Sequence, residues 1–198
     1  MDLRDKGNEE IFGSDRYIVQ ALLNAYCSGN IKGYKNEKLN ESLSYNDFDN
    51  RLNLFQEVAT AESAWTGLPL IEIGENLIFN KHTSDFYFSM QTLTLYIPAE
   101  MSHRGLQEPL ISFAYQDCSR IFKSDPEAIS VNPLKNGRNI NYADLFLLRC
   151  FNSSIVKIGN SRDLYFDQAH ADKLSAFLAA KDGEHQLTEY LYKLYHPE

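Results

Sequence analysis

Hydrophobic positions change their spacing part of the way along the chain, and this change separates a helical beginning from a strand-rich middle. In the first part, apolar residues recur at the three- and four-residue spacing of amphipathic helices. The pattern predicts a helix over 14–28 and a second helix that begins at Ser44 or Asn46 and ends before Gly67. The polar, Asn- and Lys-rich segment 29–43 between them indicates a long loop.

The middle of the chain has the shorter period and the turn residues of β-structure. Apolar runs at 70–73 and 77–79 flank a Gly-Glu-Asn turn, which predicts a β-hairpin. Segment 84–98 allows two interpretations: a short helix followed by a strand over 93–97, which we favour, or one long strand. Further short elements follow. These are strands over 110–114, 128–131 and 155–158, helical segments over 117–122 and 141–150, and a turn at 135–138.

Helical spacing returns in the last part of the chain. It predicts a helix over 167–181, a break at Gly183, and a second helix that begins near Leu187, so that the two form a helical hairpin. Short strands interspersed with helices indicate the α+β class, with a mixed β-sheet flanked by helices. We expect a single α+β domain over residues 1–198. Its parts are a mixed sheet core at 44–160 and a C-terminal helical hairpin at 161–198.

Composition and charge narrow the class of protein. Hydrophobic residues make up 43% of the 198 residues, and the net charge of −8 is spread along the chain. A basic stripe for nucleic acid or for an anionic membrane is missing from the sequence, so neither partner is expected. The first residues are charged, and no apolar run reaches the roughly 18 residues of a membrane helix. These features predict a cytoplasmic protein.

No pattern in the sequence predicts a reactive centre. The chain lacks the common nucleophile, metal and phosphate-binding motifs, and its three cysteines include no CxxC pair. A thiol of Cys118 or Cys150 could pair with His103, but both cysteines lie beside apolar runs where inert buried thiols are common. We therefore expect no catalytic residues, no metal and no cofactor.

Segment 84–149 resembles a known family. Ile97-Pro98 ends a strand, Phe113-Ala114-Tyr115 starts a helix where that family has Phe-Thr-Ser, and Asn132-Pro133 introduces a loop and another helix. This order is similar to the N-terminal domain of the SseB (enhanced serine sensitivity) family. The resemblance implies a non-enzymatic bacterial domain of a kind found among proteins that bind or neutralise toxins.

Acidity, abundant tyrosine and the resemblance together favour a protein-binding function. The main hypothesis is an intracellular immunity protein that blocks a basic toxin domain, with Asp47, Asp49, Glu72 and Glu75 as contact residues. One alternative is a structural or assembly protein that forms a homodimer or larger homo-oligomer. The other is an enzyme whose site is assembled from residues far apart in the sequence.

Overall fold

The computed structural model describes residues 1–13, 17–53, 68–83, 85–131 and 138–195. The chain divides into two compact units, residues 1–152 and 153–198, and each is described by itself. The predicted α+β class is confirmed, because the first unit combines helices with antiparallel strands. Within these described ranges, no helix is both long and apolar enough to cross a membrane.

Among the described residues, the N-terminal part of the first unit contains the helices α1 (Lys6–Phe12), α2 (Tyr17–Cys27) and α3 (Tyr45–Leu52). α1 was not predicted; the Asp5 carboxylate caps it by accepting a hydrogen bond from the Gly7 amide at 3.0 Å. Ser44 caps α3, which selects the first of the two predicted starts of this helix. The predicted remainder of that helix, over 54–67, lies outside the described residues, as does Ser14.

The main sheet contains β1 (Leu70–Asn80), β2 (Asp85–Ile97) and β3 (Glu108–Ala114) in the antiparallel order β1-β2-β3. The predicted turn at 74–76 is wrong, since β1 runs straight through it and pairs with β2 along its whole length. The favoured helix over 84–91 is also wrong, and the single long strand is the correct alternative. The pairing of β1 with β2 decides both cases. The aromatic residues of 84–91 are compatible with a helix or a strand, and hydrogen bonding to a neighbouring strand selects the strand.

The packing of β1 against β2 explains why position 74 is a glycine. A Cβ at this position would lie 2.3 Å from the Thr92 hydroxyl, and the strand register shifts between Gly74 and Glu75. The glycine therefore marks a close approach at a β-bulge, where the sequence had indicated a turn.

The remaining elements of the first unit build the other side of the core. They are the 3-10 turn η1 (Ala99–Met101), α5 (Tyr115–Ser124), β4 (Ile129–Val131), β5 (Asn139–Asn141) and α6 (Tyr142–Leu147). β4, α5 and α6 confirm the strand expected at 128–131 and the helical segments near 117–122 and 141–150, and β3 confirms the strand expected at 110–114. The turn expected at 135–138 falls almost wholly outside the described residues.

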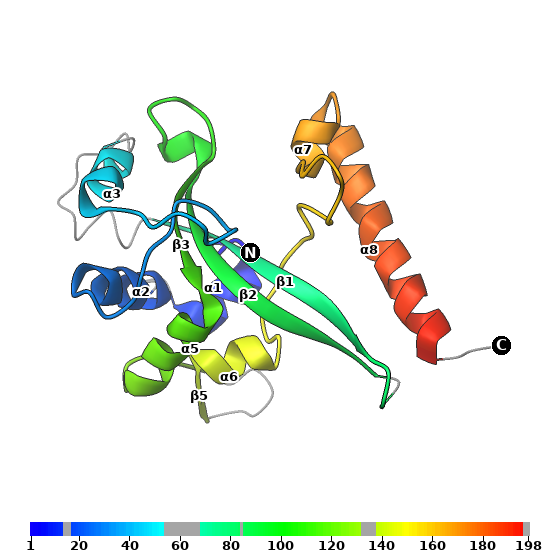
Figure 1. Ribbon diagram of the computed structural model, residues 1–198, viewed down its shortest axis with the longest axis horizontal. Coiled ribbons are helices and arrows are strands. Elements are labelled where there is room, and N and C mark those ends of the chain that lie inside the picture. The colour runs from blue at the N-terminus through cyan, green and yellow to red at the C-terminus, as the bar shows by residue number, and fades with distance from the viewer. Residues whose placement is uncertain (14–16, 54–67, 84, 132–137, 196–198) are drawn as a thin grey trace. The chain divides into compact units, whose positions relative to one another are not determined.

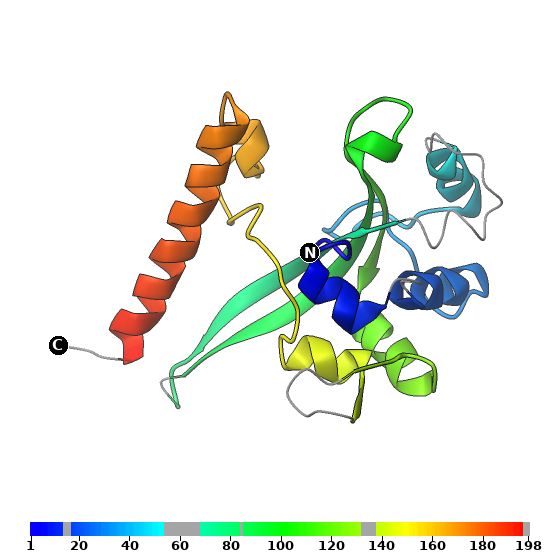
Figure 2. The same ribbon diagram turned by 180° about the vertical axis from the view of Figure 1, so that it is seen from behind.

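Aromatic rings fill the core between these elements and α1. Phe122 and Phe146 are stacked with their centroids 6.2 Å apart, and Tyr142 meets Phe122 edge-on at 5.7 Å. Phe12 brings α1 into the same cluster. α1 lies behind the sheet in Figure 1 and in front of it in Figure 2, so the helix covers one sheet face.

The second unit consists of α7 (Phe166–Ala169), α8 (Lys173–Tyr195) and the segment that precedes them. The predicted helical hairpin is wrong, because α8 continues through Gly183. A Cβ on Gly183 would lie 2.8 Å from Ile158 Cδ1, so the glycine admits this side chain against the helix. The predicted strand at 155–158 does not form; the Ile155 amide instead donates to Glu184 on α8 at 3.4 Å.

Candidate protein interface

The two longest strands of the sheet continue beyond the third. β3 pairs with β2 only over residues 92–97, so residues 75–80 of β1 and 85–91 of β2 form a two-stranded extension, here called the distal ribbon. Figure 1 shows this ribbon continuing past the end of β3 towards the turn that joins its strands. A two-stranded ribbon has little core of its own and leaves both backbone edges accessible.

Large apolar side chains cover both faces of the distal ribbon. On one face, Phe79 stacks on Phe86 with centroids 4.6 Å apart, and Leu77 lies opposite Phe88. On the other face, Tyr87 lies opposite Ile78. The side chains of Phe79 and Tyr87 are 50% and 52% exposed, so aromatic surface is accessible on each face. Exposed aromatic residues of this kind are enriched in protein interfaces.

An arginine clamp holds the base of the distal ribbon to the end of α6. Arg149 donates hydrogen bonds to both carboxylate oxygens of Glu75, and its guanidinium lies 4.6 Å from the ring centroid of Phe88. Arg149 has a φ of 55°, a backbone conformation that favours glycine, so the surrounding structure maintains it. The clamp gives the ribbon a defined direction where it leaves the core.

The four predicted contact residues fall into two groups on different elements. Asp47 and Asp49 lie on α3, where the Asp47 carboxylate is 3.8 Å from Lys35 Nζ. Glu72 and Glu75 lie on β1, and the side chain of Glu75 is only 18% exposed because Arg149 covers it. Glu75 therefore acts inside the protein as a partner of Arg149. The sequence contained no local signal for this pair, whose members are 74 residues apart.

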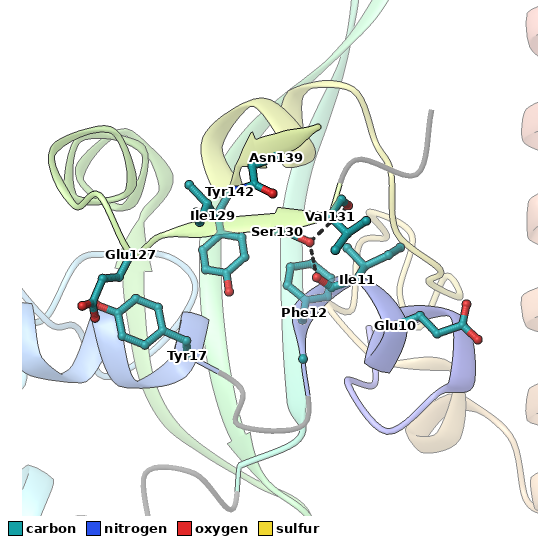
Figure 3. A pocket seen from close by; sticks show the side chains of 11 residues that line it. Glu10, Ile11, Phe12, Tyr17, Glu127, Ile129, Ser130, Val131, Asn139 and Tyr142 are labelled. Carbon is teal, nitrogen blue, oxygen red and sulfur yellow. Dashed lines mark hydrogen bonds between the residues drawn. The ribbon is translucent and has the colours of Figure 1, made fainter. Parts of the chain in front are cut away.

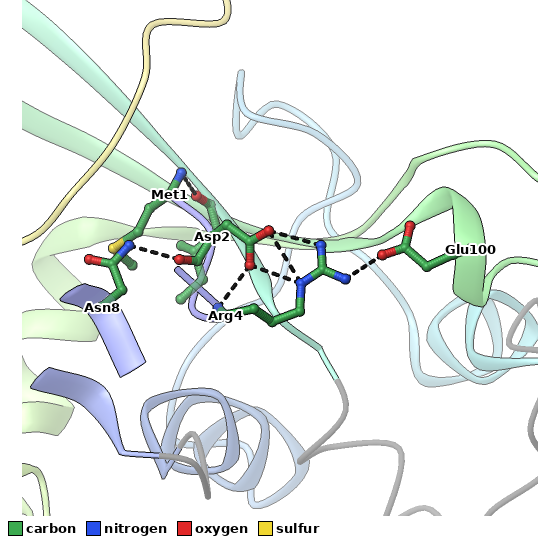
Figure 4. Close-up of polar contacts among 6 residues, drawn as sticks. Met1, Asp2, Arg4, Asn8 and Glu100 are labelled. Atoms are coloured by element: carbon green, nitrogen blue, oxygen red, sulfur yellow. Dashed lines mark hydrogen bonds and ion pairs between the residues drawn. The ribbon is translucent and has the colours of Figure 1, made fainter. Parts of the chain in front are cut away.

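Polar contacts at the N-terminal end of the first unit join several segments. Figure 4 shows Arg4 between the carboxylates of Asp2 and Glu100, and the Asn8 side chain at the Asp2 carbonyl. Burial acts to raise the pKa of Asp2, but the hydrogen bonds from Arg4 outweigh it and lower the pKa. Asn8 is fully buried and also exchanges two hydrogen bonds with the Asn152 backbone.

A groove of about 370 Å³ opens between the end of α1 and β4. Figure 3 shows Phe12 and Tyr142 at its floor and Glu10 and Glu127 at its two sides. Ser130 fixes β4 over α1 by donating a hydrogen bond to the Ile11 carbonyl. The groove combines apolar surface with carboxylates.

Two observations concern the metal and thiol chemistry that was weighed from sequence. Among the residues that the structure describes, no group of three or more His, Cys, Asp and Glu side chains is placed to hold a metal ion. Cys118 is buried, and this burial raises the pKa of its thiol, so the reactive thiolate is disfavoured.

Exposed aromatic side chains beside open strand edges are features that protein contacts use. A family model described as gliding motility associated protein GldN matches residues 1–196, and the chain belongs to this family. A comparison with curated proteins finds no match.

Family membership corrects two interpretations of the sequence. The resemblance of 84–149 to the SseB N-terminal domain is wrong, because the GldN family accounts for nearly the whole chain. The immunity-protein hypothesis and its basic toxin partner are wrong for the same reason: the family is associated with gliding motility. The expected protein partner is confirmed in general form only, since a component of a motility system acts together with other proteins.

Proposed function

We propose that this chain is a non-enzymatic structural component of the gliding apparatus that binds other proteins through its distal ribbon. The observation that carries the proposal is the extension of β1 and β2 beyond β3, with aromatic side chains exposed on both ribbon faces. Membership of the GldN family supports the assembly role over the other functions weighed. The cytoplasmic location expected from the sequence stays a prediction.

The ribbon has the features of an assembly contact. Full burial of an aromatic side chain contributes about 1.5–3 kcal/mol. Phe79 and Tyr87 are each about half exposed, so each can contribute about half of that free energy to a contact. Arg149 orients the base of the ribbon before binding, which lowers the conformational entropy lost on association. The open strand edges add main-chain hydrogen bonds if the partner contributes a strand.

Site-specific photo-crosslinking in the native host tests the contact. A photoreactive amino acid replaces Phe79 or Tyr87 on the ribbon, and Leu106, which is 61% exposed between η1 and β3, is the matched control. We expect discrete crosslinked species from the two ribbon positions and none from Leu106. Absence of crosslinks at both ribbon positions, or equal crosslinking at all three, would contradict the proposal.

Motility of the same cells tests the function. We expect Tyr87→Ser to reduce gliding at unchanged protein abundance, because the substitution removes an exposed ring that does not contribute to the core. Leu106→Ser is again the control and should leave gliding normal. Normal gliding after deletion of the whole gene would show that the chain is dispensable and would refute the assembly role.

A further inference from the structure

We propose that the distal ribbon binds a second copy of this chain. In this arrangement the outer edge of β2 over residues 87–89 pairs in antiparallel fashion with the same edge of the other copy, which gives a two-fold dimer. The two ribbons then form one four-stranded sheet. This inference rests on the proposed function and names the partner of its contact surface.

The outer edge of β2 is open where the dimer needs it. β2 bonds β1 along its inner side over the whole ribbon, while β3 ends opposite Thr92. Among the described strands, none pairs with the outer side of residues 87–90. The Gln91 amide donates to the Ser89 carbonyl at 3.2 Å, so a side chain occupies an acceptor that a second strand would use. An exposed side chain can release such a bond without disturbing the core.

The charge pattern favours a copy of this chain over a charged partner. The segment Phe-Tyr-Phe-Ser-Met at 86–90 has no charge, no proline and no glycine. Proteins commonly protect such an edge with charged residues or proline. A charged partner strand would find no counter-charge on this segment, whereas a second copy presents the same uncharged residues. β1 is less suitable because it carries Glu72 and Glu75.

Two-fold pairing about Phe88 also matches side-chain sizes. Tyr87 of each copy lies opposite Ser89 of the other, so a large side chain meets a small one. The two Phe88 rings meet at the axis as an aromatic pair. Each ring is already covered by its own Arg149, whose charge is balanced by Glu75, so the axis brings no uncompensated charges together.

Charged substitutions at Ser89 test the pairing, and sedimentation equilibrium measures the dissociation constant of the dimer. We expect Ser89→Lys and Ser89→Glu each to raise the dimer dissociation constant about tenfold or more, because like charges then approach each other across the axis. An equimolar mixture of the two variants should recover the dimer. The matched control is Asn76→Lys, because Asn76 is the β1 partner of Ser89 and places the same charge one strand further away; it should remain dimeric.

A cysteine pair gives a second measurement that does not depend on charge. In a background with Cys27 and Cys150 changed to serine, Phe88→Cys should form an intermolecular disulfide under mild oxidation. Leu77→Cys, at the β1 partner of Phe88, should not. A monomeric wild-type protein at its solubility limit would overturn the inference, as would a Ser89→Lys variant as dimeric as Asn76→Lys. If the protein is monomeric but Tyr87 crosslinks to a different protein in cells, the proposed function stands and only the self-pairing fails.

Discussion

Arg149 forms a bidentate ion pair with Glu75, with hydrogen bonds of 2.5 and 3.0 Å, although 74 residues separate them in the chain. The pair joins the end of α6 to the point where the distal ribbon leaves the sheet. It therefore converts a two-stranded extension, which alone is of marginal stability, into a surface with a fixed direction.

Removal of the Arg149 side chain should loosen the ribbon. We expect Arg149→Ala to lower the free energy of unfolding by about 1–2 kcal/mol, through loss of the ion pair and of the contact with Phe88. Arg149→Gly should lose about 1 kcal/mol less, because glycine adopts the φ of 55° without strain. Urea denaturation measures both. Arg120→Ala, which breaks an exposed pair with Asp117 and a 3.5 Å hydrogen bond to the Asn30 carbonyl, is the control; an equal loss there would refute the clamp.

Gly74 should not tolerate a side chain while Thr92 is present. Because an added Cβ would lie 2.3 Å from the Thr92 hydroxyl, Gly74→Ala should cost about 1–3 kcal/mol of stability. In the double variant with Thr92→Ala, the loss should be smaller than the sum of the single losses. Thermal unfolding of the four proteins gives this coupling. Gly159→Ala, where nothing lies within 4 Å, should have little effect, and strict additivity at Gly74 and Thr92 would contradict the contact.

Asn8 should be essential for the stability of the first unit. Its buried amide bonds the Asp2 carbonyl at 2.7 Å and the Asn152 carbonyl at 2.9 Å, and its oxygen accepts from the Asn152 amide at 2.8 Å. Asn8→Ala leaves these backbone groups without partners and should cost about 3 kcal/mol in denaturant unfolding. Asn24→Ala, at an exposed position on α2, should stay within about 0.5 kcal/mol of the wild type. Similar losses at both sites would argue against the proposed role of Asn8.

Tyr115 should make stability fall at alkaline pH. Burial raises the pKa of Tyr115 from 10.0 to about 12, so the folded state favours the neutral phenol. A raised folded-state pKa contributes stability that is complete below the unfolded value and is lost as pH rises from about 10 to about 12. Tyr115→Phe should therefore flatten the decline of the unfolding free energy in this window. An unchanged pH profile for the variant would show that other groups cause the decline.

The candidate interface was only partly visible in the sequence. Acidic residues and abundant tyrosine indicated a protein partner, which family membership supports in general form only. Local acidity selected Glu75, which the structure places against Arg149. An ion pair between residues so far apart leaves no periodic signal. Tyr87 and Phe79 could not be recognised either, since an exposed aromatic residue in a strand has the same sequence pattern as a buried one.

The sequence by itself determined the α+β class, the start of α3 to within two residues and the short elements around the aromatic core, because caps, stops and periodicity act over a few residues. Tertiary structure decided the rest. β1 pairs with β2 through Gly74, and α8 continues through Gly183, because in each case a distant side chain fills the space that the missing Cβ leaves. From the sequence, a glycine that ends a helix or strand cannot be told apart from a glycine that makes room for a neighbouring side chain. At Gly74 and Gly183, the packing of Thr92 and Ile158 shows that the second case holds.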